Sequence, residues 1–523
     1  MGFWITAGSV LILALISGVL IREPSNVVRQ TQEPYTLHLE TIENPENAVD
    51  TFAKALTFPT VGKVDSPNHV GDPVAFQNLH KHLEKAFPTV YKALKVEKVN
   101  EYSLLMKWTG SDVALKPMLF ISHCDVVPAP HTKSQNWTYP PFSGTVADGF
   151  IWGRGALDTK ISLVGVLEAI KQLLTVNVSP QRTIFLAFGH DEEMGGEYGA
   201  KLIAERLKTH HNVEEFEIVL DEGGMIDIDG LGAKKLIPNT QVAGIGMATK
   251  GFESWKINLK GEGGHSSIPP TGHATSVAAR MAAILARFEA QQTSTRLVSP
   301  TVEFLQGLAP GVRYAPLRMV FELANNRIIN PILGQIIGGL GNRVLNAFVR
   351  TTAAVVAINA GGGAHNVLPL EGSIEINFRT LPGDTSSVKE YIDQIIQNES
   401  ISGHARAEKI ISGYPASAVT PSSGPNYELM VRAIMETFTP DPKVTKQKLI
   451  VAPLLIVGGT DALWYEEISA GKVFRFNPMK VESSKGDIDR IHGVDERIGV
   501  EGYLDAVRFY MRFIKLAAGD SDS

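Results

Sequence analysis

The stretch TIFLAFGHDEEMGG, residues 183–196, decides the fold. Its first part, Thr183 to Phe188, is a continuous apolar run of strand length, which is typical of a strand buried on both faces of an α/β sheet. Three acids, Asp191, Glu192 and Glu193, follow shortly after this run. Like charges gathered in one place repel unless protons or cations compensate them. The strand end is therefore either a solvated turn or part of a metal site.

Two further apolar runs lead into polar clusters of the same kind. Met118 to Ser122 runs into His123 and Asp125, and Glu217 to Leu220 runs into Asp221. Apolar runs alternate with helical patterns along the chain after about residue 35, which predicts an α/β domain. Because ligands bind at the carboxyl-terminal edge of such sheets, we expect the three polar clusters to meet there.

Each polar residue also has an ordinary structural explanation. His123 and Asp125 can form a satisfied structural pair, since residues two apart in an extended chain point the same way. Asp158 follows a glycine-rich turn and enters a helical pattern, where an aspartate commonly caps the helix. His492 is a distant imidazole that is ambiguous alone. A dinuclear metal site explains them together, because it needs a bridging carboxylate, carboxylate and imidazole ligands, and one free glutamate that deprotonates water.

The motifs that carry this chemistry resemble the zinc-dependent aminoacylase, carboxypeptidase and dipeptidase family. They are HCDVVP (123–128), GRGALDTK (153–160), DEEMGG (191–196), DEGG (221–224) and IHGVDE (491–496). The resemblance covers nearly the whole chain after residue 35, and it implies two zinc ions per chain with Asp158 as the bridge. His123 and Asp221 would complete one metal site. Glu193 and His492 would complete the other.

The same resemblance implies the remaining roles. Glu192 would be the general base, and Asp125 would fix the orientation of His123. His265, in GGHSS (263–267), would stabilise the oxyanion of the tetrahedral intermediate, within one chain or across a dimer; without the resemblance, a histidine that caps a loop is favoured. The predicted substrate-binding residues are Asn366, Arg379, Gly459 and Thr460, among which the Arg379 fork suits a carboxylate and the last two can also be a tight turn.

A change of pattern near Lys250 divides the chain. Residues 254–260 and 373–379 alternate between apolar and polar side chains, and a glycine-rich turn and a helical pattern lie between them. We expect a signal peptide or membrane anchor at 1–24, a catalytic domain at 35–249 and 386–523, and an inserted α+β lid and dimerisation domain at 250–385. With the resemblance, the fold class is α/β: a zinc-peptidase catalytic domain with a mixed central sheet, plus the inserted lid.

Two apolar stretches are interpreted separately. Residues 3–21 are uncharged and long enough to cross a bilayer, so a signal peptide and an uncleaved anchor fit equally. Either predicts the secretory pathway, with a secreted or a membrane-anchored, luminal catalytic domain, and sequons at Asn136, Asn177 and Asn398 agree. Residues 316–349 contain polar interruptions that argue against a spanning helix. A buried pair of lid helices is favoured there over a surface for lipid or a greasy substrate.

Composition limits the remaining functions. With 523 residues, 44% hydrophobic and 20% charged, the chain can form two globular domains. A formal net charge of −6 without a long basic run argues against binding of nucleic acid. The only cysteine, Cys124, excludes an intrachain disulfide, so the fold must rest on its core, on metal or on oligomerisation.

The expected function is reversible hydrolysis of N-acyl amino acids by two zinc ions. The N-terminal segment, the enlarged lid and RIHGVDE (490–496) are similar to the family branch that hydrolyses and forms N-fatty-acyl amino acids, and the carboxypeptidase S branch is near. An apolar lid would favour a fatty chain, because each buried methylene contributes about 0.8 kcal/mol. The alternatives are a peptidase or dipeptidase and, in another class, a non-catalytic binding protein. A homodimer through the lid and association with a membrane or lipoprotein are compatible with this function.

Overall fold

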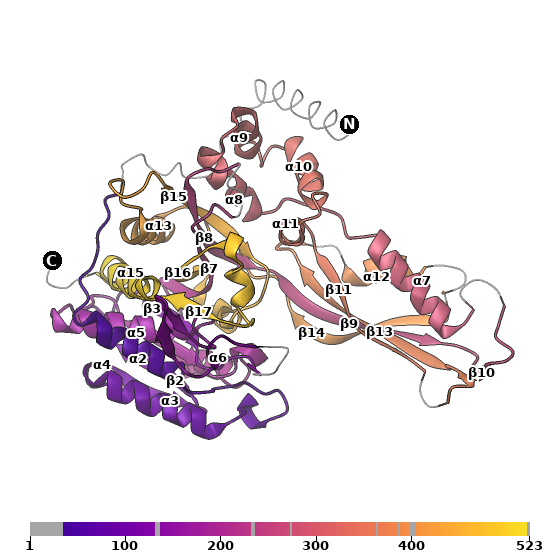
Figure 1. Ribbon diagram of the computed structural model, residues 1–523, viewed down its shortest axis with the longest axis horizontal. Coiled ribbons are helices and arrows are strands. Elements are labelled where there is room, and N and C mark those ends of the chain that lie inside the picture. Colours follow the sequence, from indigo (N-terminus) through magenta and orange to yellow (C-terminus); the bar gives the residue numbers. More distant parts are fainter. Residues whose placement is uncertain are drawn as a thin grey trace.

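The computed structural model describes residues 35–130, 136–231, 236–271, 275–361, 364–384, 387–397, 401 and 403–519. The segment expected to be a signal peptide or anchor, 1–24, lies outside these residues, as does the sequon at Asn398. Within the described ranges, no helix has the length and apolar character that crossing a membrane requires. Figure 1 shows a large α/β body from which a smaller, elongated unit extends.

An eight-stranded mixed sheet forms the centre of the large body and confirms the predicted fold class (Figure 1). β3 runs parallel to β6 and β7, and β16 continues the parallel set beside β7, whereas β1 and β6 are antiparallel to β2. In sheet order the strands are β1 (Lys95–Val99), β2 (Ser103–Trp108), β6 (Ile184–Gly189), β3 (Met118–His123), β7 (Ile218–Asp227), β16 (Val473–Val481), β8 (Thr240–Thr249) and β15 (Lys448–Ile456).

Strands β3, β6 and β7 are the three strands predicted from the apolar runs. β3 and β6 each end one residue beyond the predicted run, so that His123 is the last residue of β3 and the acids 191–193 follow shortly after β6. β7 is longer than predicted, because it continues through Asp221 and Glu222 to Asp227. Successive side chains of a strand alternate between the two faces. These two acids therefore cannot both serve the same side of the sheet.

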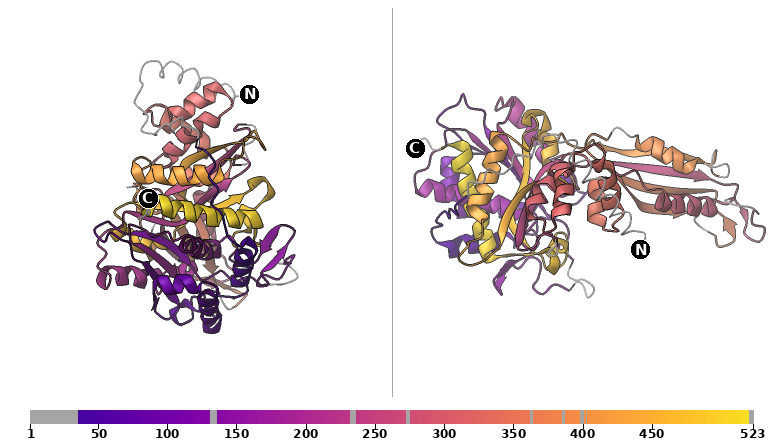
Figure 2. Two further views of the ribbon diagram at one scale, coloured as in Figure 1. Left: turned by 90° about the vertical axis from the view of Figure 1, so that its left-hand side faces the viewer. Right: turned by 90° about the horizontal axis from the view of Figure 1, so that it is seen from above.

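Helices cover both faces of this sheet. The apolar sides of the helices on one face join alternate strand residues in a single core, and α5 is buried on nearly all sides because α2 and α15 pack against it. Those helices are α2 (Pro45–Ala55), α3 (Pro73–Ala86), α4 (Pro88–Ala93), α5 (Lys160–Thr175), α13 (Pro425–Phe438) and α15 (Val500–Ala518). α6 (Ala200–Thr209) packs on the other face. Figure 2 shows α13 and α15 lying side by side.

The smaller unit, here called the lid, is a four-stranded antiparallel sheet with two helices on one face (Figures 1 and 2). The predicted alternation at 254–260 and 373–379 belongs to its two central strands, whose inward residues are buried. In sheet order the strands are β11 (Thr352–Ala360), β13 (Glu371–Thr380), β9 (Gly251–Lys260) and β14 (Ala405–Tyr414), and the helices are α7 (Val277–Ala290) and α12 (Val388–Ile396).

The lid extends further along the chain than the expected boundary at residue 385. α12 packs with α7, and β14 pairs antiparallel with β9, although both elements follow that boundary. β14 reads ARAEKIISGY, in which charged residues obscure the alternation of a half-buried strand. It becomes a strand because it pairs with the edge of β9, a long-range effect that its own sequence does not specify.

The apolar stretch 316–349 forms helices beside the central sheet rather than over the lid sheet (Figure 1). α8 (Thr301–Leu308) packs its Phe304 and Leu308 against Ile450 and Ala452 of β15. α9 (Ala315–Glu322), α10 (Ile329–Gly338) and α11 (Arg343–Val349) add a small core of their own. The pair of buried lid helices expected at 316–349 is thus three helices, α9 to α11, which follow α8 and carry several exposed apolar side chains, with Ile328 51% exposed and Val344 52% exposed.

Candidate metal centre

Four separate parts of the chain bring the predicted ligands together at one edge of the central sheet. His123 is the last residue of β3, and Glu192 and Glu193 follow β6 in a short 3-10 helix (Glu192–Met194). Asp158 lies just before α5. The segment that carries His492 is held nearby because β17 (Arg497–Gly499) pairs with β5 (Phe150–Trp152), which precedes the Asp158 turn.

Asp158 lies between the two histidines. Its Oδ1 is 3.1 Å from His123 Nε2, and its Oδ2 is 2.9 Å from His492 Nε2. Glu193 Oε1 lies 3.2 Å from the same nitrogen of His492. A carboxylate that offers one oxygen to each of two imidazoles has the arrangement that a bridging ligand needs.

Two groups of side chains could each hold a cation. One contains His123, Asp158 and Glu193, and the other contains His123, Glu192 and Glu222; within each group the ligand atoms lie within 4.8 Å of one another. Imidazole nitrogens and carboxylate oxygens are the donors that zinc takes in catalytic sites. The residues present therefore fit a metal centre.

Asp125 organises both the histidine and the acids. His123 Nδ1 donates to the Asp125 carbonyl at 3.0 Å and lies 3.4 Å from its carboxylate. The same carboxylate accepts the backbone N–H groups of Glu192 at 3.2 Å and Glu193 at 3.1 Å. The contact predicted between Asp125 and His123 is present, and Asp125 also fixes the backbone on which the expected base stands.

The structure differs from the prediction at Asp221. Its carboxylate accepts the N–H of Glu222 at 2.8 Å and that of Ala462 at 3.0 Å, and it is bonded to the Thr460 hydroxyl. Glu222, the next residue along β7, points to His123, with 3.5 Å between Oε2 and Nε2. Because side chains alternate along a strand, only one of the two can face the cluster, and that residue is Glu222. The sequence contained one sign of this alternative, because DEGG (221–224) places a second acid, Glu222, next to Asp221.

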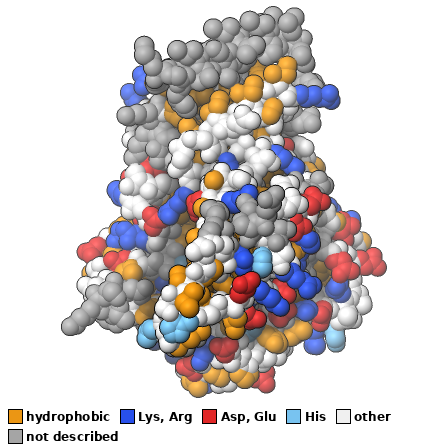
Figure 3. Space-filling model, turned by 90° about the vertical axis from the view of Figure 1, so that its right-hand side faces the viewer, with side chains coloured by type: hydrophobic (Ala, Val, Ile, Leu, Met, Phe, Trp, Pro, Cys, Tyr) orange, Lys and Arg blue, Asp and Glu red, His pale blue; other side chains and the backbone are white. Residues whose placement is uncertain are grey.

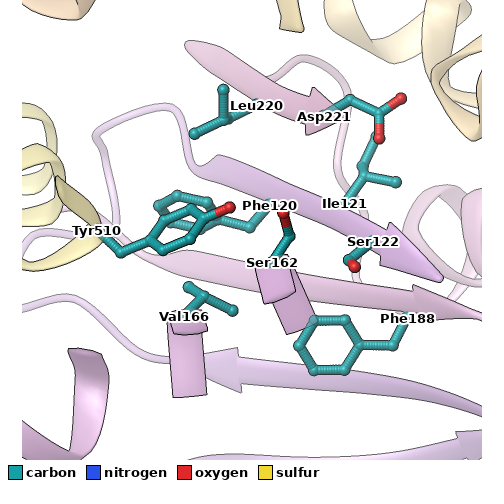
Figure 4. A pocket seen from close by; sticks show the side chains of 9 residues that line it. All are labelled: Phe120, Ile121, Ser122, Ser162, Val166, Phe188, Leu220, Asp221 and Tyr510. Carbon is teal, nitrogen blue, oxygen red and sulfur yellow. The ribbon is translucent and has the colours of Figure 1, made fainter. Parts of the chain in front are cut away.

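Next to Asp221, the strands and helices pack densely and leave only a small cavity. Asp221 lines a buried cavity of about 10 Å³ together with Ser122, Ser162 and Tyr510, which Figure 4 shows between β3, β7 and the helices of one face. A space of this size holds at most one water molecule. The cavity is therefore a packing gap beneath the cluster and is too small for a substrate.

Glu496 is a further residue that positions the site, although in its motif only His492 had a predicted role. It is fully buried, and one of its oxygens accepts the N–H groups of Leu157 and Asp158 at 2.7 and 3.2 Å. Its other oxygen pairs with Arg154 at 2.5 Å. Glu496 therefore holds the Asp158 turn and its own strand, which follows His492, in one place.

The charges of the cluster are unbalanced without a cation. Burial raises the pKa of Glu222 to about 8, and burial followed by the charge of Glu222 raises the pKa of Glu192 well above its ordinary value. Hydrogen bonds to Asp158 and then to Glu193 raise the pKa of His492 to about 10. Buried acids that resist ionisation lack compensating positive charge, which bound cations supply.

The predicted lid residues His265 and Asn366 lie elsewhere. His265 is in β10 (Gly264–His265), which pairs with β12 (Val367–Leu368), and Figure 1 places these strands at the outer end of the lid. Both side chains are exposed, and the His265 ring accepts from Ser267. Within one chain the structure does not bring these two residues to the metal cluster.

Arg379 and the loop at Gly459 lie much closer to it. Arg379, near the end of β13, stacks over Phe252 with 4.7 Å to the ring centre and is bonded to Tyr414. The Tyr414 hydroxyl in turn lies against Gly459. Thr460 points inward, because its hydroxyl is bonded to Asp221 and accepts from Arg475 at 3.4 Å. The substrate contact expected of that hydroxyl stays a prediction, and within the chain the hydroxyl holds the loop through Asp221 and Arg475.

Comparisons with known proteins identify the family of the chain. The model of Peptidase family M20/M25/M40 matches residues 119–516. The chain is 33% identical to the probable carboxypeptidase S-like 2 of Dictyostelium discoideum (97% of this chain, 93% of the relative). It is also 33% identical to the N-fatty-acyl-amino acid synthase/hydrolase PM20D1 of Homo sapiens (90% and 87%) and 31% identical to carboxypeptidase S of Saccharomyces cerevisiae (90% and 84%).

Solved structures agree in fold. Human carnosine dipeptidase 1 aligns with a TM-score of 0.58 at 15% identity over 91% of this chain and 96% of that one. A metallo-carboxypeptidase of the M20 family from Sulfolobus solfataricus aligns with the same TM-score at 18% identity over 90% and 98%. The family match, the relatives above 30% identity and the shared fold lead to one conclusion: the chain is a hydrolase that belongs to Peptidase family M20/M25/M40.

Proposed function

We propose that this chain is a dinuclear zinc amide hydrolase that acts on N-acyl amino acids and, at suitable concentrations, joins fatty acid and amino acid in reverse. The observation that carries the proposal is the position of Asp158, with one carboxylate oxygen at each of His123 and His492. Glu193 and His492 would hold one zinc ion. His123 and Glu222 would hold the other, with Glu222 in the place first expected for Asp221.

When bound, zinc would polarise the scissile carbonyl and make water acidic enough to attack near neutral pH. Glu192 would take the proton from that water and pass it to the leaving amine. Asp125 supports this role, since it fixes the backbone N–H of Glu192. Arg379 would pair with the carboxylate of the amino acid part. His265 would stabilise the oxyanion from the lid of a second chain, because its own lid tip lies far from its own cluster.

A Glu192→Gln variant tests the proton-transfer step. We expect it to bind zinc as the natural protein does, since the amide keeps the shape of the side chain, and to lose at least a hundredfold in turnover. Metal content by mass spectrometry and hydrolysis of an N-acyl amino acid would be measured on the same preparation. Normal turnover by this variant would exclude Glu192 as the base. If the natural protein with its zinc were inactive on amides, the binding-protein alternative would replace the proposal.

Two classes of substrate remain to be separated, since the relatives include N-fatty-acyl-amino acid synthase/hydrolases and carboxypeptidases. The exposed apolar side chains in and beside α9 to α11, among them Ile328 and Val344, favour a long acyl chain, because each methylene that a substrate buries adds about 0.8 kcal/mol to binding. We expect an N-oleoyl amino acid to have a larger kcat/KM than a matched dipeptide. A preference for the dipeptide by orders of magnitude would favour the carboxypeptidase alternative.

The proposed location is the secretory pathway. The apolar run at residues 3–21 supports it, together with the sequons at Asn136 and Asn177. Amino-terminal sequencing of the mature protein from its native host would identify a cleaved signal peptide by a new first residue beyond the run. An intact run would identify an anchor.

A further inference from the structure

Tyr414 is directed toward the site by an irregularity in its strand. It is the last residue of β14 and pairs with Phe252 of β9. The register shifts between Ile411 and Tyr414, and Gly413 between them has a φ of 58°, where a Cβ would collide with the Phe252 carbonyl. A bulge of this kind bends a strand and changes the direction of the side chain that follows it.

Tyr414 and Arg379 share one aromatic support. The Tyr414 ring lies 5.7 Å from the Phe252 ring, and the Arg379 guanidinium lies over the same Phe252 ring at 4.7 Å. The guanidinium donates to the Tyr414 hydroxyl oxygen. That oxygen accepts in this bond, and among the described residues no acceptor for the Tyr414 O–H is found, so the proton can be donated to a bound ligand.

The Tyr414 hydroxyl also touches the large body. A Cβ added at Gly459 would collide with that hydroxyl and lie 2.8 Å from Tyr414 Cζ. The Gly459 loop leads directly into Thr460, which is bonded to Asp221 behind the cluster. Burial raises the pKa of the Tyr414 hydroxyl, the Arg379 guanidinium opposes that rise, and the negative charge of Glu192 adds to it. Tyr414 thus lies where the lid meets the catalytic loop.

Arg379 supplies positive charge beside this phenol, whereas Glu192 supplies negative charge. Among the described residues, the partners of Arg379 are Asn377, Tyr414 and the Phe252 ring, and none is a carboxylate. Lys250 lies close enough that burial and then the charge of Arg379 lower its pKa to about 7. An arginine without a carboxylate beside a phenol with a free proton is a preformed site for a planar anion.

We propose that Tyr414 donates its O–H to the substrate carboxylate beside Arg379, so that the two residues of one chain form a paired clamp selecting substrates with a free carboxylate. This inference rests on the proposed function and deepens it. Tyr414 acts on binding, and the proton transfer stays with Glu192. The amide nitrogen and acyl chain are unaffected, because the clamp contacts only the other end of the substrate.

The test compares Tyr414→Phe with the natural protein on two substrates, an N-acyl amino acid and its uncharged carboxamide. For the carboxylate substrate we expect KM to rise about tenfold, equivalent to 1.4 kcal/mol, with kcat nearly unchanged. For the carboxamide we expect kcat/KM to change less than twofold. Tyr391→Phe is the matched control, since it removes a lid hydroxyl that donates to Gln291 O away from the site. It should change neither value.

A second variant guards against a folding defect. Gly459→Ala should displace the phenol and raise KM for the carboxylate substrate, and it should do so less when Tyr414 is already Phe, since contacting residues are not additive. Equal losses on both substrates, or an unchanged KM for Tyr414→Phe, would overturn the clamp.

Binding measured on zinc-loaded Glu192→Gln separates this proposal from the function itself. There Tyr414→Phe should raise Kd for the N-acyl amino acid about tenfold and leave that for the carboxamide unchanged. If the natural protein turns over substrate but this difference is missing, only the clamp fails. If the natural protein neither binds nor hydrolyses N-acyl amino acids, the proposed function fails and the clamp fails with it.

Discussion

Two adjacent acids show how much a single position decides. Asp221 and Glu222 share one motif, yet Asp221 accepts backbone N–H groups of Glu222 and Ala462 while Glu222 faces His123. We predict that Glu222→Gln lowers the zinc content from two ions to about one per chain, because a neutral amide is a poor zinc ligand. Metal analysis after dialysis would measure this.

Asp221→Asn is the matched comparison. We expect it to keep both zinc ions and to lower the free energy of unfolding by about 1–3 kcal/mol, because an amide cannot satisfy all the donors that the buried carboxylate accepts. Chemical denaturation would measure that loss. A protein with Asp221→Asn that lost zinc while Glu222→Gln kept it would restore Asp221 as the ligand.

His80 has no role in the proposed reaction, but it makes the free energy of unfolding depend on pH. It lies in α3, its Nε2 donates to Tyr102 O at 3.0 Å, and burial, followed by the charge of Lys98, lowers its pKa to about 4. Between pH 6.5 and about 4 the unfolded chain therefore binds a proton that the folded chain does not, so stability falls as pH falls through this window. We predict that the natural protein loses about 2 kcal/mol more than His80→Gln across it. Urea unfolding at a series of pH values would show equal losses if the shift were absent.

At the scale of elements, strands β7 and β8 of the central sheet approach each other closely at Gly224 and Gly244. At Gly224 of β7 an added Cβ would collide with the Gly244 carbonyl oxygen and lie 2.8 Å from its carbon, both in β8. We predict that Gly224→Ala destabilises the fold by about 1–3 kcal/mol, since backbone cannot yield as a flexible side chain does.

Gly458 provides the control for this prediction. A Cβ there meets nothing within 4 Å, so Gly458→Ala should change the unfolding free energy little. Thermal unfolding of the two variants beside the natural protein would compare them. Equal melting temperatures for Gly224→Ala and the natural protein would mean that the β7 and β8 backbones separate more easily than their packing indicates.

At the scale of the whole molecule, the outer end of the lid carries His265 away from the metal cluster of its own chain. Figure 3 looks onto the outer end of the lid, where charged and apolar side chains are mixed, and Ile268 and Val367 near His265 are 80% and 56% exposed. If His265 acts in a second chain, co-expressed Glu192→Gln and His265→Ala chains would form one complete site per mixed dimer. We predict that activity returns to roughly a quarter of normal, as random pairing in a two-fold dimer requires.

The controls for this experiment are the two variants expressed alone, each of which should be nearly inactive. Differently tagged chains allow the mixed dimer to be purified and its kcat measured per site. Activity that stays at the level of the separate variants would place the action of His265 within its own chain, after a closure of the lid.

The sequence by itself determined the kinds of ligand and the strands that carry them. The positions of His123, Asp158 and Glu193 could be noticed because short apolar runs and glycine turns are local signals, and imidazole and carboxylate are donors that a metal needs. The role predicted for His492 came from the resemblance to a family, because no local pattern around it is specific. The alternation of β9 and β13 could likewise be recognised, because one face of each is buried.

Three features depend on long-range pairing: which acid of the pair in β7 faces the cluster, where the lid ends, and the contact of Tyr414 with Arg379 and Gly459. β7 continues past the point where the apolar run stops because β16 and β8 pair with it. β14 is a strand because it pairs with the edge of β9. The direction of a side chain depends on such distant pairings and on bulges within them, and local sequence patterns carry no record of either.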